Sequence, residues 1–209
     1  GFKKERNTLN EYLARLSKVE QRTFDSWGKD KQLAFLINAY NAYTIELILT
    51  EYPDIDSIRD LGSFFSSPWK KEIAPLLGEI RTLDDIEHNM IRGDNKYQEP
   101  RIHFAVNCAS IGCPNLATTA FVANALEEQL ARQESIFLND PAKNNYDKAN
   151  KKLVLSSIFD WYGGDFVKVY GSVHKYVSKH LTEDTQHQNL ISSERVSTSY
   201  DYDWSINKI

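Results

Sequence analysis

Apolar side chains recur at helical spacing near the start of the chain. Residues 10–21 carry Leu13, Leu16 and Val19 among charged positions, which predicts an amphipathic helix. Residues 31–51 are far more apolar and end at Pro53 and Asp54. Their i, i+3, i+4 series predicts a central helix of the hydrophobic core, with Leu33, Leu36, Ile37, Tyr40, Thr44, Leu47 and Ile48 on its apolar face.

The pattern then becomes irregular. Residues 57–69 are rich in Ser, Gly and Phe and predict a loop with short helical turns. Residues 70–81 hold Gly78 between two apolar residues, which predicts a short hairpin. Thr82 and Asp85 are typical of a helix start, and that helix is expected to end at Gly93. Its inward residues would be Leu83, Ile86, Met90 and Ile91.

Alternation returns after Pro100, where Phe104 and Val106 predict a short strand over residues 103–107, followed by a turn at 108–110. Further elements are a helix over 122–138, a strand over 152–155, a helical turn over 158–162 and a last helix over 174–181. The tail is polar up to an aromatic cluster at residues 200–204, which is expected to dock on the body of the protein.

These elements predict an α+β fold, mainly helical with a small antiparallel sheet, because helices outnumber strands and no βαβ alternation is visible. We divide the chain into a helical lead-in (1–30), a core domain (31–181) and a tail (182–209) that docks through residues 202–207.

The composition and charge of the chain limit the classes of partner that it is expected to bind. The 209 residues are 41% hydrophobic and 12% aromatic, as in ordinary globular proteins, and the formal charge of −4 gives no basic surface for nucleic acid. No membrane span is expected, because Asn38, Asn41 and Glu46 interrupt the longest apolar stretch. No signal peptide is visible, and Gly1 is an unusual natural start.

Both cysteines lie between Arg101 and Pro114, where we expect the chemistry. Cys108 at a predicted strand end is the candidate nucleophile, although free cysteines most often act as small buried hydrophobic residues. Cys113 could resolve an oxidised Cys108 or brace the loop as its disulfide partner. The C-x4-C spacing lacks a second close pair, so we expect no metal site.

Two histidines compete as the catalytic base. An extended chain would place His103 and Cys108 on opposite faces, about 16 Å apart at roughly 3.3 Å per residue, with Asn107 on the His103 face. His88, on the polar flank of its helix, could instead reach the thiol, or it could be a solvated surface residue. Glu87 lies nearer the apolar side and could orient the base.

Four further polar residues are candidates for binding. Asn38 and Asn41 lie on the most apolar helix, where buried amides either brace a loop or orient an imidazole. Arg92 and Arg101 could hold a substrate carboxylate.

Several motifs occur in order along the chain: LAFLINAYNAYTI, SIRDL, TLDDIEHNMIR, PRIHFAVNCASIGCPNL, LSSIFDWYGGDF and YDWSIN. Together they resemble the domain of unknown function 547 family. The resemblance implies a periplasmic or secreted location. Its motif residues here are Asn38, Asn41, Glu87, His88, Arg101, His103, Asn107, Cys108 and Cys113. By analogy it suggests a papain-like or transglutaminase-like core, with the departure that the cysteine follows a strand instead of opening a long helix.

The leading hypothesis is therefore a thiol-dependent enzyme acting on a peptide-like or small thiol substrate such as glutathione, without a cofactor. The alternative is a non-catalytic module for a peptide or partner, with a Cys108–Cys113 brace. Thiol–disulfide exchange is a third option, weakened because the spacing is not C-x-x-C. The oligomeric state is left open.

Overall fold

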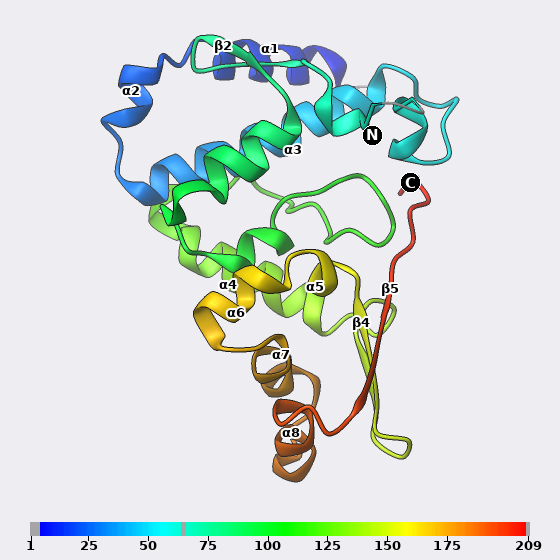
Figure 1. Ribbon diagram of the computed structural model, residues 1–209. Helices are drawn as coiled ribbons and strands as arrows, with labels where there is room; N and C mark the ends of the chain where they lie inside the picture. Colours follow the sequence, from blue (N-terminus) through cyan, green and yellow to red (C-terminus); the bar gives the residue numbers. More distant parts are fainter. Residues whose placement is uncertain (1–4, 64–65, 208–209) are drawn as a thin grey trace.

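A computed structural model describes residues 5–63 and 66–207 (Figure 1). The α-helices are α1 (Arg6–Ser17), α2 (Gln21–Asp25), α3 (Lys29–Leu49), α4 (Leu126–Leu138), α5 (Ile158–Trp161), α6 (Gly163–Tyr170), α7 (Val173–Leu181) and α8 (Thr185–Ser192). Short 3₁₀ turns are η1 (Ile58–Leu61), η2 (Pro68–Lys70), η4 (Gly93–Asn95), η5 (Pro100–Phe104) and η6 (Ala123–Ala125), and η3 (Asp85–Ile91) is a π-helix. The strands are β1 (Ala74–Leu76), β2 (Glu79–Arg81), β3 (Asn145–Asp147), β4 (Lys152–Ser156) and β5 (Ser197–Asp201).

The predicted central helix is confirmed as α3. Leu36 and Ile37 are fully buried, and Leu33, Tyr40 and Leu47 are at most 4% exposed. Helices α1 and α2 pack on this helix, and we call the surrounding cluster the α3 core. The first helix starts and ends four residues earlier than expected, and α2 was not predicted.

The predicted hairpin and the capped helix after it are also confirmed. Strands β1 and β2 pair antiparallel around Leu77 and Gly78, whose φ angles of 56° and 85° suit a tight hairpin turn. The Thr82 hydroxyl accepts a hydrogen bond from the backbone N–H of Asp85, as a helix cap does. The helix that follows continues as the π-helix η3.

The predicted strand over residues 103–107 is wrong. This segment begins with the 3₁₀ turn η5, in which Pro100 occupies the first turn and the Glu99 carboxylate accepts from the backbone N–H of Arg101. A proline with preset φ and a capping carboxylate favour a helical turn over extended chain. The separation of about 16 Å between His103 and Cys108, which assumed a strand at roughly 3.3 Å per residue, therefore does not apply.

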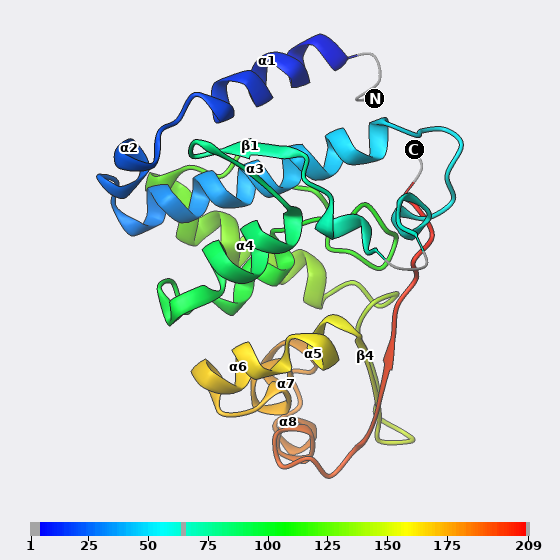
Figure 2. The ribbon, with the colours of Figure 1, turned by 45° about the horizontal axis from the view of Figure 1, so that its top comes forward.

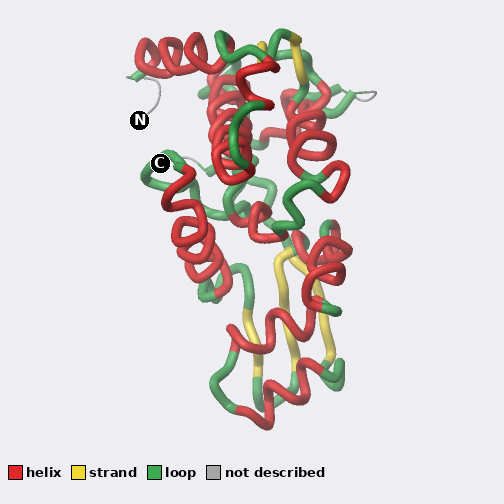
Figure 3. The backbone as a smooth tube through the Cα atoms, turned by 90° about the vertical axis from the view of Figure 1, so that its left-hand side faces the viewer, coloured by secondary structure: helices red, strands yellow, loops and turns green. Residues whose placement is uncertain are grey.

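The second half of the chain forms a separate cluster, which we call the aromatic core. It joins η5 to elements of the C-terminal half, and its rings are Phe104, Phe137, Tyr146, Phe159, Phe166 and Tyr176. Strand β4 pairs antiparallel with β3 and parallel with β5, so this second sheet is mixed. Figure 3 shows these strands together in one half of an elongated molecule. Helices α4, α5 and α7 match the prediction, but α7 is not the last helix, and the sequence did not predict α6, α8, β3 or β5.

The C-terminal segment returns to the first half of the molecule. After α8, strand β5 runs along the edge of β4 and the chain continues toward the C-terminal end of α3 (Figure 2). Ile206 forms an isolated antiparallel bridge with Ser110, in the loop that carries both cysteines. The α+β class with a small antiparallel sheet is confirmed, whereas the papain-like core stays a prediction. Within the described residues, no helix is both long and apolar enough to cross a membrane.

Candidate functional site

The cysteine loop is held by the side chain of one asparagine on α3. The Asn41 amide donates to the carbonyl of Ala105 at 2.9 Å, and its oxygen accepts from the backbone N–H of Asn107 at 2.8 Å. Asn107 in turn donates to the carbonyl of Pro114 at 2.6 Å. The bracing alternative for Asn41 is therefore the one that the structure shows, and it fixes where the loop leaves η5.

Asn38, one helical turn earlier on α3, holds a second segment of backbone in the same way. Its amide donates to the carbonyl of Phe121 at 2.8 Å, and its oxygen accepts from the backbone N–H of the same residue at 2.9 Å. Asn38 and Asn41 thus satisfy backbone groups of two separate segments, as buried amides commonly do.

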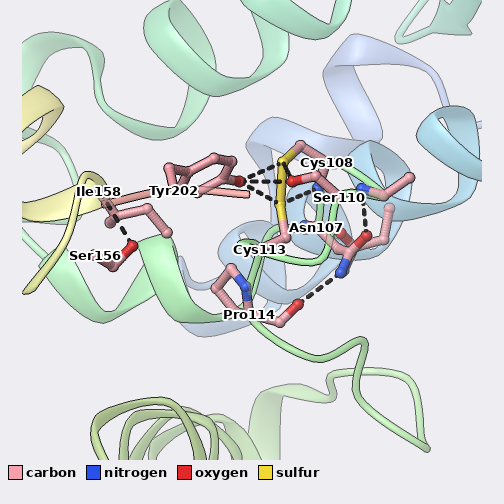
Figure 4. Close-up of a disulfide and its surroundings, with 10 residues drawn as sticks. Asn107, Cys108, Ser110, Cys113, Pro114, Ser156, Ile158 and Tyr202 are labelled. Atoms are coloured by element: carbon pink, nitrogen blue, oxygen red, sulfur yellow. Dashed lines mark hydrogen bonds between the residues drawn. A yellow bond between two sulfur atoms is a disulfide. The ribbon is translucent and has the colours of Figure 1, made fainter. Parts of the chain in front are cut away.

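Cys108 and Cys113 form a disulfide (Figure 4). Cys113 is buried, 4% exposed, whereas Cys108 is half-buried. Ser110 donates to the Tyr202 hydroxyl at 2.9 Å, and that hydroxyl lies 2.9 Å from the Cys108 sulfur and 3.1 Å from the Cys113 sulfur. Because disulfide sulfurs carry no hydrogen, the tyrosine is the donor in both contacts.

The C-terminal segment packs directly on this loop. The backbone N–H of Gly112 donates to the carbonyl of Asp203, and that of Ile111 donates to the carbonyl of Ser205, both at 2.8 Å. A Cβ atom on Gly112 would lie 2.9 Å from the backbone nitrogen of Asp203, so only glycine allows this approach. Backbone contacts thus place Tyr202 against the disulfide.

His103 belongs to a buried pair that the sequence did not reveal. It is 2% exposed, and its Nε2 lies 3.0 Å from a carboxylate oxygen of Asp165 on α6. Asn107, which would share a face with His103 on an extended chain, instead bonds within the loop, to the carbonyl of Pro114 and the backbone N–H of Ala109. The ring stacks on Tyr162 with centroids 4.1 Å apart, and Nδ1 has no hydrogen-bond partner among the described residues.

These contacts define the protonation of His103. Burial lowers its pKa, and the hydrogen bond with Asp165 opposes this shift without cancelling it. A neutral imidazole whose Nε2–H donates to Asp165 keeps a free lone pair on Nδ1. The same hydrogen bond, followed by that from Arg92, holds the pKa of Asp165 well below its usual range despite partial burial.

His88 lies at the other end of the same polar chain. Arg92 donates from Nε to Asp165 and from Nη1 to the His88 Nδ1, both at 2.7 Å. Because a guanidinium only donates, this Nδ1 is an acceptor and the proton of a neutral ring lies on Nε2. That nitrogen is 3.9 Å from the Asp84 carboxylate, so the half-exposed His88 lies between Asp84 and Arg92, each four positions away along the chain.

Glu87 is more deeply buried than the adjacent His88. It is 5% exposed, and its carboxylate lies near the Tyr40 and Tyr162 hydroxyls. The pKa values of both tyrosines are raised, mainly by burial and then by this carboxylate. A π-helical turn such as η3 often marks a functional position, because its extra residue redirects neighbouring side chains.

These side chains meet in one cavity of about 300 Å³. The candidates Glu87, His88, His103 and Cys108 all line it, together with Cys113. Six aromatic residues form much of the wall: Tyr40, Trp69, Trp161, Tyr162, Tyr202 and Trp204. A larger hollow of about 470 Å³ lies by α7 and α8; its lining includes the carboxylate of Glu134 but no cysteine.

The two arginines expected to hold a substrate carboxylate are engaged elsewhere. Arg101 forms ion pairs with Glu99 and Glu127, at 2.6 and 2.7 Å. Arg92 pairs with Asp165 behind His103, and neither arginine lines the cavity. Sequence reasoning did not assign Asp165 or Tyr162 to the site, although they lie in the GGDF and DWYGG stretches. It expected Tyr202 and Trp204, in the YDWSIN motif, only to dock on the body of the protein.

The fold and this cavity define an α+β protein with an aromatic, disulfide-lined site between two cores. The chain belongs to the family described as Protein of unknown function, DUF547, which matches residues 24–138. No curated protein and no solved structure matches the chain significantly.

Proposed function

We propose that the cavity binds a small molecule or a short peptide, with the Cys108–Cys113 disulfide as a fixed part of its wall. The observation that carries this proposal is that the disulfide closes the loop lining the cavity, so neither sulfur is available as a nucleophile in this state. A volume of about 300 Å³ is at the lower end for small-molecule sites, and mixed aromatic and polar walls are typical of them.

A fragment screen by protein-observed NMR tests this function. Three tryptophans line the cavity and Trp27 lies apart from it, so the four indole N–H signals report binding and location together. Fragments are expected to shift the signals of Trp69, Trp161 and Trp204 without shifting that of Trp27.

Two variants on η3 test whether fragments bind in this cavity. His88→Trp places a large ring at the cavity and is expected to block binding. Asn89→Trp is the matched control, because the next residue is exposed and does not line the cavity. Binding should survive in the Cys108→Ala/Cys113→Ala variant. Fragments that bind equally well to His88→Trp would contradict the proposal.

A second candidate is a thiol-dependent enzyme that is active only after reduction. It is favoured by the shared cavity of Cys108, His88 and His103, and by the greater exposure of Cys108 than of Cys113. An external dithiol would supply two electrons, becoming a disulfide while both cysteines gain protons. An imidazole would then accept the Cys108 proton. The thiolate would attack an acyl carbon and expel its leaving group, or attack a substrate disulfide such as oxidised glutathione, forming a mixed disulfide and releasing one glutathione thiolate, which takes the proton from the imidazolium.

Alkylation of the reduced protein, followed by peptide mass analysis, tests this second function. Cys108 should react faster than free cysteine and much faster than Cys113, and His103→Gln or His88→Gln should slow the reaction. A Cys108 that reacts no faster than free cysteine leaves ligand binding as the function. Thiol–disulfide exchange instead requires a measurable redox equilibrium with glutathione.

The disulfide also supports the proposed periplasmic or secreted location, since such bonds persist mainly in oxidising compartments. Trapping thiols in intact cells before lysis tests it. The native protein should then carry no alkyl label on either cysteine.

A further inference from the structure

The charges that line the cavity all have one sign. Asp84 and Glu87 contribute carboxylates, and no lysine or arginine belongs to the lining within residues 5–63 and 66–207. Building on the proposed binding function, we propose that the ligand carries an organic ammonium group, primary or quaternary. Glutathione and other anionic peptides would then be poor ligands, contrary to the expectation from the sequence.

Glu87 is the strongest argument for a cationic ligand. It is only 5% exposed, and the groups near its carboxylate include the uncharged hydroxyls of Tyr40 and Tyr162. It takes part in none of the ion pairs found in the described part of the chain. A buried carboxylate without a cation is costly, and a bound ammonium would offset that cost.

The aromatic wall provides the second half of a cation site. Trp161, Tyr202 and Trp204 lie with ring centroids 4.6 to 5.3 Å apart, and Trp69 packs edge-on against Trp204 at 6.0 Å. Rings of this kind attract cations through their electron-rich faces. Trp161 is 44% exposed, so part of this wall is open to solvent.

Two rings of the wall already carry cations of the protein itself. The Arg59 guanidinium lies 5.2 Å from the Trp204 centroid, and that of Arg92 lies 4.8 Å from the Tyr162 centroid. Arg92 is balanced by Asp165, and His103 is kept neutral by burial. The field of Glu87 therefore extends into the cavity, where it adds to burial in raising the pKa of Tyr202 to about 12.

Matched pairs of ligands that differ only in charge test the inference. Choline is compared with its neutral isostere 3,3-dimethyl-1-butanol, and butylammonium with 1-butanol, by titration of the wild-type protein under NMR observation. The ammonium members should shift the signals of Trp69, Trp161 and Trp204 but not that of Trp27, and should bind about tenfold more tightly than their isosteres. Higher salt should weaken only the ammonium members.

Two charge-removing variants locate the effect. Glu87→Gln keeps the shape of the side chain and is expected to weaken ammonium binding about tenfold while leaving the neutral isosteres unchanged. Glu11→Gln is the control, since it removes the same charge from an exposed position on α1. Circular dichroism of both variants verifies the fold.

The outcomes separate the two proposals. Equal affinities within each pair, tighter binding of glutathione, or an undiminished choline affinity in Glu87→Gln would overturn the ammonium inference. If fragments of any charge still bind in the cavity, the proposed binding function survives that result. If neither fragments nor ammonium ligands shift the cavity indoles, both proposals fail.

Discussion

The two cores of the protein are built from different side chains in different ways. The α3 core is mostly aliphatic and is organised by one long helix, which is buried on nearly every side and without interruption over residues 39–44. The aromatic core collects rings from η5, α4, β3, α5, α6 and α7, so no single element organises it. An aliphatic core around one helix is encoded locally, whereas an aromatic core assembled from many segments depends on long-range contacts.

The cavity lies where these two regions meet. Glu87, His88 and both cysteines come from segments within the family match of residues 24–138, whereas Tyr162, Tyr202 and Trp204 lie beyond it. His103 shows the connection directly, because its partner Asp165 comes from α6. The site therefore depends on both regions and on the correct contact between them.

Replacing Phe104 is expected to cause the largest loss of stability and to show whether the aromatic core depends on the α3 core. Phe104 leaves η5 to become fully buried in the aromatic core, with ring centroids 4.9 Å from Phe137 and 5.7 Å from Phe166. Phe104→Ala is expected to lower the free energy of unfolding by about 4 kcal/mol, because it leaves a cavity among packed rings. Chemical denaturation followed by circular dichroism and by tryptophan fluorescence measures this loss.

The same experiment asks whether the two cores unfold together. Leu36→Ala in the α3 core is the control and should cost about 3 kcal/mol. Both probes should give one coincident transition in each variant, as cooperative domains do. Separate transitions for the two probes in Phe104→Ala would mean that the aromatic core unfolds independently.

Asn41 and Asn38 offer a matched pair within one helix. Asn41→Ala leaves the carbonyl of Ala105 and the N–H of Asn107 without their partner, and should cost about 3 kcal/mol. Asn38→Ala removes an equivalent pair of bonds to Phe121 from a less buried site, and should cost about 2 kcal/mol.

Ligand titration separates these two variants in function. Binding in the cavity should weaken in Asn41→Ala, because the cysteine loop loses its anchor, and persist in Asn38→Ala. Equal losses of affinity would show that general destabilisation, and not the placement of the loop, determines binding.

Removal of the disulfide should have a smaller effect on stability. The bond closes a short loop, so Cys108→Ser/Cys113→Ser is expected to lose about 2 kcal/mol of unfolding free energy. The fold should persist, because Gly112 and Ile111 keep their backbone bonds to the C-terminal segment. Thermal unfolding with and without a reductant measures the loss. An unchanged melting temperature on reduction would exclude a bracing role.

The smallest effect concerns pH. Burial lowers the pKa of His103 in the folded protein, so below the unfolded pKa of about 6.5 the unfolded state binds the proton more readily. The contribution of neutral His103 to the free energy of unfolding is therefore fully present above pH 7. It is lost as the pH falls toward the pKa of His103 in the folded protein. Lowering the pH from 7.5 to 5.5 should cost about 1 kcal/mol more in the wild type than in His103→Gln. Identical curves for wild type and His103→Gln would refute the assignment.

Local patterns predicted much of the α3 half. The periodicity of α3, the Gly78 turn and the Thr82 cap act over a few residues, so their signals survive in the linear chain. The same reasoning failed at residues 103–107, where alternation suggested a strand. Pro100 and the Glu99 cap outweighed a weak pattern of two apolar residues there.

Local reasoning also selected residue types that belong to the cavity. Glu87, His88, His103 and Cys108 were recognised as reactive groups on a resemblance and on their chemistry, and they do line one cavity. Their partners were not found, because Asp165 lies 62 positions after His103 and Tyr202 lies 94 positions after Cys108. Nothing in a local window relates such residues.

The linear order of residues is thus sufficient for the helices, turns and caps, since these depend on neighbours a few positions away. The three-dimensional packing alone brings Tyr202 to the disulfide, directs Arg92 and Arg101 into ion pairs away from the cavity, and leaves Glu87 buried without a cation. The reason is physical: burial and pairing are set by which distant segments come into contact, and these same quantities determine the charge and protonation of the site.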